Sequence, residues 1–158
     1  MIISERIEIP GTAERVWELL WDVPRIANCI PGCLETKTVT PGKEYKAVVE
    51  QRVGQFKARF NLDISIVSAD EPRRLEVSAR GQDVITKSFT SADLSVELEP
   101  HGVDAVSLNL VVNVKLLGKL ATLGQTMVER KSEEVVRQFA GAVGSELGAV
   151  KSSDDGGG

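Results

Sequence analysis

The chain has 158 residues, of which 42% are hydrophobic and 27% charged, a composition typical of a single globular domain. The formal net charge of −4 argues against non-specific nucleic-acid binding, which needs a basic surface. No apolar run approaches the roughly 18 residues of a membrane span, and the N-terminus lacks the charged start and apolar core of a signal peptide, so we expect a cytoplasmic protein.

The first predicted elements are a strand and two short helices. Alternating isoleucines indicate a strand over residues 2–9. Thr12 is a good N-cap for a helix over residues 13–22, because its hydroxyl can accept a hydrogen bond from a free N–H group of the first turn. Pro24 breaks this helix, and a second short helix is expected over residues 25–29.

Six strands are predicted next, each with alternating apolar and polar residues: residues 34–40, 44–53, 55–67, 75–79, 86–99 and 106–114. Alternating strands joined by short turns are typical of an antiparallel meander with one apolar and one solvated face. In the strand over 86–99, Phe89 is out of phase with Ala92 and Leu94, which predicts a β-bulge between them.

A long helix is predicted to follow, from about residue 116 to residue 147. Its apolar residues recur at three- and four-residue steps, and its roughly 30 residues would extend about 45 Å. Such a helix is long enough to lie across the apolar face of the sheet and close it into a cup. We therefore expect one α+β domain over residues 1–148, followed by a disordered polar tail over residues 149–158.

Four segments carry a resemblance to a known family: Val16-Trp17-Glu18-Leu19-Leu20 with Asp22, Cys29-Ile30-Pro31-Gly32-Cys33, Val53-Gly54-Gln55-Phe56-Lys57-Ala58-Arg59-Phe60 and Leu117-Gly118-Lys119-Leu120-Ala121-Thr122-Leu123-Gly124. In these segments the chain resembles the family of the G subunit of carbon monoxide dehydrogenase, which belongs to the START/birch-pollen-allergen-like (SRPBCC) superfamily. The resemblance implies a helix-grip fold, in which a curved antiparallel sheet of about seven strands wraps a long C-terminal helix.

The resemblance also implies a function and partners. Members of this family are accessory proteins of molybdenum hydroxylases, so the chain is expected to help attach such an enzyme to the inner face of the cytoplasmic membrane and to link it to the quinone pool. Many members extend past the last helix, and that extension is the suspected attachment. The tail here is short, acidic and glycine-rich, and should not bind anionic lipid. Attachment then uses another surface, or the chain is a shortened form.

No catalytic or metal-binding constellation is predicted. The single histidine, His101, is interpreted as an exposed residue at a hairpin tip, which argues against a Ser-His-Asp triad and against a histidine-rich metal site. Cys29 and Cys33 are interpreted as small buried hydrophobic residues in a reducing compartment, because a redox pair is usually spaced Cys-x-x-Cys.

Ten residues are predicted to line a ligand-binding cavity between the sheet and the long helix: Phe56, Phe60, Leu62, Phe89, Leu94, Leu108, Leu120, Met127, Val128 and Lys131. All but the lysine are apolar, as is usual for ligand pockets of roughly 300–1,000 Å³. Small residues that interrupt the large ones, such as Ala58 and Ala79, leave room for a void.

Two features leave alternatives open. Lys131 either lays its stem along the cavity rim with its ammonium in water, or donates a hydrogen bond to a ligand carbonyl such as a quinone oxygen. Trp17 and Trp21 either both lie in the core, or Trp21 joins Val23 and Ile26 in an exposed apolar mouth that meets lipid or a partner protein.

The predicted function is therefore that of a non-catalytic accessory protein. It would bind a quinone or another isoprenoid or lipid ligand, hold no covalent cofactor, and help a molybdenum hydroxylase with membrane attachment or electron delivery. One alternative is an aromatase/cyclase- or hydratase-like enzyme acting on a small hydrophobic substrate, which would need inward-facing acid–base residues. A second is an assembly factor with a filled interior.

Overall fold

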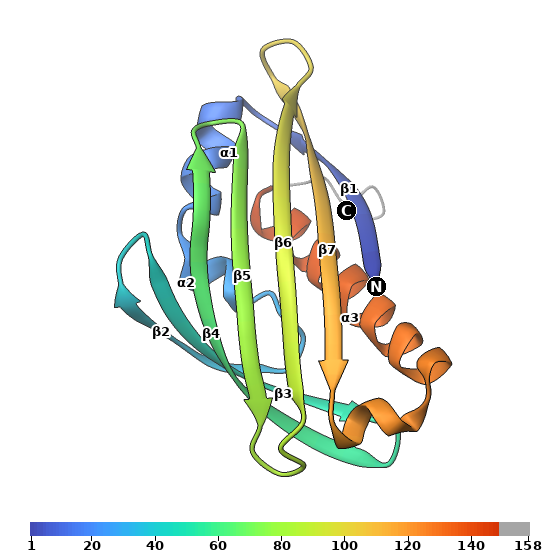
Figure 1. Ribbon diagram of the computed structural model, residues 1–158. Helices are drawn as coiled ribbons and strands as arrows, with labels where there is room; N and C mark the ends of the chain where they lie inside the picture. The colour runs from blue at the N-terminus through green and yellow to red at the C-terminus, as the bar shows by residue number, and fades with distance from the viewer. Residues whose placement is uncertain (149–158) are drawn as a thin grey trace.

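The computed structural model describes residues 1–148, which form one curved sheet with helices along its concave side (Figure 1). The predicted tail, residues 149–158, lies outside the described residues. The elements in chain order are β1 (Ile2–Pro10), α1 (Ala13–Leu20), α2 (Val23–Ala27), β2 (Cys33–Thr40), β3 (Glu44–Val53), β4 (Phe56–Asp70), β5 (Arg74–Asp83), β6 (Phe89–Pro100), β7 (Ala105–Leu117), the 3-10 helix η1 (Lys119–Leu123) and α3 (Gln125–Glu146).

The seven strands pair antiparallel in the order β1-β7-β6-β5-β4-β3-β2. Strands β2 to β7 form the predicted meander, and β1 pairs with the outer edge of β7. The chain leaves β1 through both short helices before it enters β2 at the far edge of the sheet (Figure 1). This architecture, closed by a C-terminal helix, confirms the predicted helix-grip fold.

Alternation along the strands creates the two faces of the sheet. In β4, Ala58, Phe60 and Ile64 are buried on the concave face, whereas Arg59 and Asp63 between them are exposed. The even-numbered residues of β6 and β7 continue this apolar face, because the register between the strands keeps partners on the same side. The concave face is therefore an almost unbroken apolar surface.

The first helix begins where the sequence predicts. Thr12 Oγ1 accepts a hydrogen bond from the Arg15 N–H at 3.2 Å, which satisfies one of the free donors of the first turn. Val16 and Leu20 are buried against β6, β7 and the end of α3, in the largest apolar cluster of the described residues. Helix α2 packs next to it, against β2 and β3.

The long helix is shorter than predicted. Leu116 still belongs to β7, η1 follows, and α3 begins only at Gln125. Gly118 and Gly124, on either side of η1, have φ angles of 100° and 105°, which side-chain-bearing residues rarely adopt and which an α-helix cannot contain. The apolar residues before Gln125 thus form a strand end and a 3-10 turn rather than a helical stripe.

Helix α3 lies toward one side of the sheet. It packs chiefly against β1 and, to a lesser extent, against β7 (Figure 1). Val136 joins Ile3 and Val112 in a small buried cluster, and Val143 joins the core around α1. The concave face of β4 and β5 therefore looks onto a space and not onto a tightly packed helix.

The predicted bulge near Phe89 is wrong. The pairing of β6 with β5 and with β7 runs without a register shift, and the irregularities of the sheet lie instead in β2–β3 and near Ile66 in β4. Without a bulge, strict alternation places Phe89 on the convex face, opposite to Ala92 and Leu94. The residue is 52% exposed.

Candidate ligand-binding cavity

A cavity of about 280 Å³ lies between the concave face of the sheet and the helices. Strands β3 to β7 form its floor, α2 with the end of α1 forms one wall, and α3 forms the other. The α3 wall consists of Val128, Lys131, Ser132, Val135, Val136, Phe139 and Val143. The hollow expected under the C-terminal helix is thus present, with a volume near the lower end of ligand pockets.

Four polar side chains interrupt an otherwise apolar lining: Gln51, Thr90, Lys131 and Ser132. Three of them are engaged with backbone carbonyls, since Gln51 Nε2 donates to Pro31 at 2.5 Å, Thr90 Oγ1 to Lys115 at 3.2 Å, and Ser132 Oγ to Val128 at 2.8 Å. The inner surface therefore offers mainly dispersion contacts and the hydrophobic effect to a guest.

Lys131 is the one cavity-lining side chain with a formal charge. Its side chain is 22% exposed, and its Nζ lies 3.3 Å from Glu134 Oε2 on the solvent side of α3. An ammonium has three donor hydrogens, and this contact uses one of them. The stem of Lys131 lies along the lining as predicted, and the two interpretations of its ammonium remain predictions.

The cavity is not fully enclosed. Lining residues on α3, on β3 and just after α2, among them Val128, Val135, Gln51 and Ile30, are half-buried. Two contacts anchor α3 near its two ends.

Each of these contacts joins α3 to a different part of the chain. Near one end of α3, an ion pair connects Arg25 of α2 to Glu146. Near the other, Gly54 in the β3–β4 turn has φ of 61° and lies so close to Met127 that a Cβ would be 3.0 Å from its Sδ.

Five of the ten predicted cavity residues line the cavity: Phe60, Leu62, Leu94, Val128 and Lys131. The strand residues among them were found because period-2 alternation shows which side chains share a face. The same signal marks residues that the prediction left out, such as Val77, Ala92 and Val112, which also line the cavity. Among the polar lining residues, Gln51 shares this phase with Val49 and Val53, so alternation marks it as well. Ser132 lies on α3, where the strand signal does not apply.

The other five predicted residues lie elsewhere. Leu108 is fully buried in the core beside α1, and Leu120 is the fully buried residue of η1 itself. Phe56 packs beside Leu120, with Lys119 Nζ 5.4 Å from its ring centroid. Phe89 faces outward from β6, and Met127 is exposed on the first turn of α3. Most of these errors follow from the misplaced start of α3 and the predicted bulge.

The two tryptophans do not match either alternative fully. Trp17 is buried, and Trp21 is 37% exposed and stacks on Trp17 with ring centroids 5.7 Å apart. Trp21 also covers Gly42 in the β2–β3 turn. Val23 and Ile26 point the other way and line the cavity, so they do not form an exposed mouth with Trp21.

The single histidine and the two cysteines lie outside the cavity lining. His101 is exposed in the β6–β7 turn, and its Nε2 lies 2.5 Å from the Oγ of Ser107, which Arg6 and Glu8 also contact. Burial raises the pKa of both half-buried cysteine thiols, Cys29 and Cys33, and disfavours the thiolate.

The curved meander, the terminal helix and the apolar cavity define a protein of the START-like helix-grip class. A conserved protein from Geobacillus kaustophilus has a similar structure, with a TM-score of 0.79 at 22% identity over 93% of this chain and 95% of that one. A START superfamily protein from Mycobacterium smegmatis gives a TM-score of 0.68 at 16% identity, covering 92% and 96% of the two chains. These likenesses establish the fold.

The similar structures include one enzyme of the kind considered above. The ZhuI aromatase/cyclase from Streptomyces sp. R1128 gives a TM-score of 0.68 at 14% identity over 93% of each chain. No curated protein matches the chain by sequence. The family model of the carbon monoxide dehydrogenase G subunit (CoxG) matches residues 6–148, and the chain belongs to this family.

Proposed function

We propose that the chain is a non-catalytic accessory protein of a molybdenum hydroxylase and that its cavity holds part of a quinone or a similar isoprenoid lipid. The observation that carries this proposal is an apolar cavity of about 280 Å³ with one half-buried lysine in its lining. Transfer of apolar surface from water into such a cavity contributes about 25 cal/mol per Å². The family's name is that of a subunit, which supports a role beside an enzyme.

The size and the opening of the cavity favour partial enclosure of the ligand. Its volume is just below the range of pockets that bury most of a drug-sized molecule, so a long isoprenoid chain does not fit inside completely. The head group would lie within the cavity, and the remaining chain would leave through its open side. A ligand held in this way stays close to the lipid phase or to a partner protein, as membrane attachment and electron delivery require.

The apolar part of this proposal is tested by filling the cavity. Ala92 lines the cavity from β6, so Ala92→Phe should lower the affinity for a short-chain quinone at least tenfold, or about 1.4 kcal/mol, in titration calorimetry. Ser95→Phe is the matched control, because Ser95 lies on the same strand with the opposite phase. Equal affinity of the Ala92→Phe variant and the wild type would contradict binding in this cavity.

The role of Lys131 is tested separately. We propose that its ammonium donates a hydrogen bond to a ligand carbonyl, and a hydrogen bond to a charged group contributes about 1.5–3 kcal/mol. Lys131→Met should then weaken short-chain quinone binding by roughly tenfold or more. Arg130→Met, on the exposed side of the same helix turn, is the control for loss of one positive charge. Unchanged affinity in Lys131→Met would leave its ammonium as a solvated group at the rim.

The enzyme alternative receives less support from the cavity. General acid–base catalysis needs a titratable pair within reach of the substrate. Among the described lining residues, Lys131 is the single titratable side chain, and no carboxylate or imidazole faces the cavity. The alternative of an assembly factor with a filled interior is also disfavoured, because the interior contains a cavity.

A further inference from the structure

Three turns that are distant in sequence meet at one end of the sheet, the lower end in Figure 1: the β3–β4 turn, the β5–β6 loop and the β7–η1 junction. Direct contacts join them. The Leu120 N–H donates to Ser88 Oγ at 2.9 Å, and the Val84 N–H donates to the Arg59 carbonyl at 3.0 Å. We call this end, comprising residues 52–59, 84–90 and 115–124, the tip.

The tip exposes large apolar side chains next to one another. Ile85 is 62% exposed and Leu117 is 66% exposed, and Val84 and Phe89 are also exposed. Phe89 and Leu117 are register partners on the convex face of β6 and β7, so their side chains are neighbours. Single exposed apolar residues are common, but a cluster of this kind marks a contact surface.

The charged residues of the tip are all basic. In a chain of net charge −4, the three tip segments contain six cations and no acidic residue: Arg52, Lys57, Arg59, Lys87, Lys115 and Lys119. Lys57 and Arg59 pair with Glu50, just outside the tip. The other four, Arg52, Lys87, Lys115 and Lys119, are exposed and form no ion pair with any residue of the described chain, 1–148.

A buried carboxylate at the end of β5 holds the β5–β6 loop in shape. Asp83 is fully buried and accepts hydrogen bonds from the Arg59 N–H at 2.7 Å, the Thr86 N–H at 2.8 Å and the Thr86 hydroxyl at 2.5 Å. The loop that carries Val84, Ile85 and Lys87 is therefore preorganised and presents its exposed side chains in a fixed arrangement.

We propose that the tip docks on an anionic lipid bilayer. Aliphatic and aromatic side chains surrounded by unpaired cations complement a surface with an apolar interior and negative head groups. This inference deepens the proposed function, on which it rests, because the tip adjoins the cavity: the cavity-lining residues Thr90 and Leu116 are the chain neighbours of Phe89 and Leu117. Docking by the tip brings this end of the cavity toward the lipid.

Co-sedimentation with vesicles tests the docking surface. The wild-type chain should bind vesicles of phosphatidylcholine with phosphatidylglycerol, should bind vesicles of phosphatidylcholine alone much more weakly, and should release on addition of salt. Lys87→Glu with Lys119→Glu should weaken binding by more than about 25-fold, since each lysine near the surface contributes about fivefold. Failure of the wild-type chain to bind anionic vesicles, or equal binding to both vesicles, would overturn the proposal.

Matched variants separate the tip from the rest of the surface. Ile85→Ser with Phe89→Ser should also reduce vesicle binding, whereas Val67→Ser with Val103→Ser should not, although Val67 and Val103 are at least as exposed. Lys37→Glu with Lys43→Glu is the corresponding control for charge. Equal losses in tip and control variants would show that no particular surface docks. Circular dichroism confirms that each variant is folded before it is compared.

Binding of a short-chain quinone in solution without vesicles distinguishes this inference from the proposed function. Tip variants that keep quinone affinity but lose vesicle binding support both. A wild-type chain that binds quinone and ignores vesicles overturns docking by the tip alone. A wild-type chain that binds anionic vesicles through the tip and binds no quinone overturns the cavity proposal alone.

Discussion

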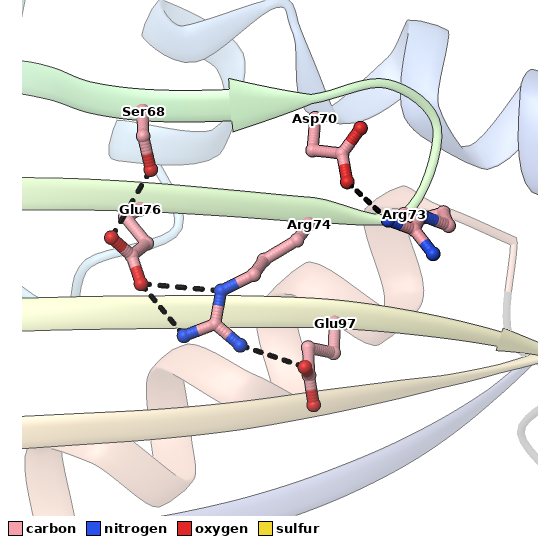
Figure 2. A network of polar contacts seen from close by, with 6 residues as sticks. All are labelled: Ser68, Asp70, Arg73, Arg74, Glu76 and Glu97. Atoms are coloured by element: carbon pink, nitrogen blue, oxygen red, sulfur yellow. Dashed lines mark hydrogen bonds and ion pairs between the residues drawn. The ribbon is translucent and has the colours of Figure 1, made fainter.

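The two ends of the sheet carry their charges in opposite ways. At the β4–β5 turn, every cation drawn in Figure 2 faces a carboxylate: Arg73 pairs with Asp70, and Arg74 lies 2.6 Å from Glu76 and 2.7 Å from Glu97. At the tip, four exposed cations have no carboxylate partner among the described residues.

The apolar residues at the β4–β5 turn and at the tip also differ. At the β4–β5 turn, Leu75 and Val96 are buried beneath the ion pairs, whereas Phe89 and Leu117 at the tip face outward. The charges drawn at the β4–β5 turn are paired with one another, whereas the tip keeps apolar area and unpaired charge available for a partner. Because both ends are built from the same antiparallel strands, the contrast comes from side-chain choice and not from the fold.

The largest expected effect concerns the buried carboxylate beneath the tip. Asp83→Ala leaves the N–H groups of Arg59 and Thr86 without their acceptor in a buried site, and we expect a loss of about 3 kcal/mol of unfolding free energy. Urea denaturation measures this loss. Glu76→Ala at the β4–β5 turn is the control, because Glu76 is half-exposed and water can replace its partners. Equal losses of unfolding free energy in the two variants would show that the hydrogen bonds of Asp83 contribute no more than the ion pairs of Glu76.

Two glycines, one at each end of the sheet, allow the cost of adding a Cβ to be compared between the two ends. Gly118 at the tip has φ of 100°, and a Cβ there would lie 3.1 Å from the Ser88 Cα, so Gly118→Ala should cost about 2 kcal/mol. Gly102, in the β6–β7 turn at the opposite end, has φ of 73° and open space around it, so Gly102→Ala should cost about 1 kcal/mol. Thermal unfolding of the two variants checks the order, and the reverse order would contradict the tight packing of η1 on the β5–β6 loop.

The effect of Asp83 should depend on pH in a defined direction. Burial acts to raise the pKa of Asp83, but hydrogen bonds from the Thr86 hydroxyl and from the N–H groups of Arg59, Thr86 and Ile85 outweigh it and hold the pKa below its ordinary value. Since the folded state has the lower pKa, the charge stabilises the fold above the unfolded-state pKa, and this contribution is lost as pH falls through the folded-state pKa.

Urea denaturation across acidic pH tests this direction. The stability difference between the wild type and Asp83→Asn should be constant near neutral pH and should shrink below about pH 4. A difference that grows on acidification would contradict the assigned hydrogen bonds.

The smallest effect is expected at the β4–β5 turn. Arg74→Gln removes exposed contacts with Glu76 and Glu97, and exposed ion pairs contribute little because water and salt screen them. We expect no resolvable change in the unfolding midpoint and no change in vesicle binding. A marked loss of vesicle binding in this variant would show that the charge of the whole chain, and not the tip, governs attraction to lipid.

The strands and the first helix were predictable because their signals are local. Alternation in β4 identified its inner face, and Thr12 identified the start of α1 from one side chain and the turn that follows it. The same rule identified Phe60, Leu62 and Leu94 as inward-facing. The prediction failed at Phe89, because it assumed a bulge where the alternation is in fact unbroken. Phe89 therefore faces outward, and this position makes it part of the tip.

The start of α3 was not predictable from periodicity. Leu116, Leu120 and Leu123 continue the three- and four-residue spacing of the helix, but they occupy a strand end and a 3-10 turn. Hydrophobic spacing indicates which residues are buried, but it does not indicate whether they lie in an α-helix, a 3-10 turn or the end of a strand. The glycines at 118 and 124 were the available signals against one continuous helix.

The sequence by itself determined most of the element types and the inner face of the sheet, because alternation, capping and turn residues act over a few positions. Four of its segments also indicated the family. Only the tertiary structure decided that α3 lies toward β1 and leaves a hollow over β4 and β5, and that Gln51 and Ser132 line it. It also decided that cations from three distant turns gather at one end. The physical reason is that strand register and helix packing join residues far apart in the chain, and no local pattern encodes those distances.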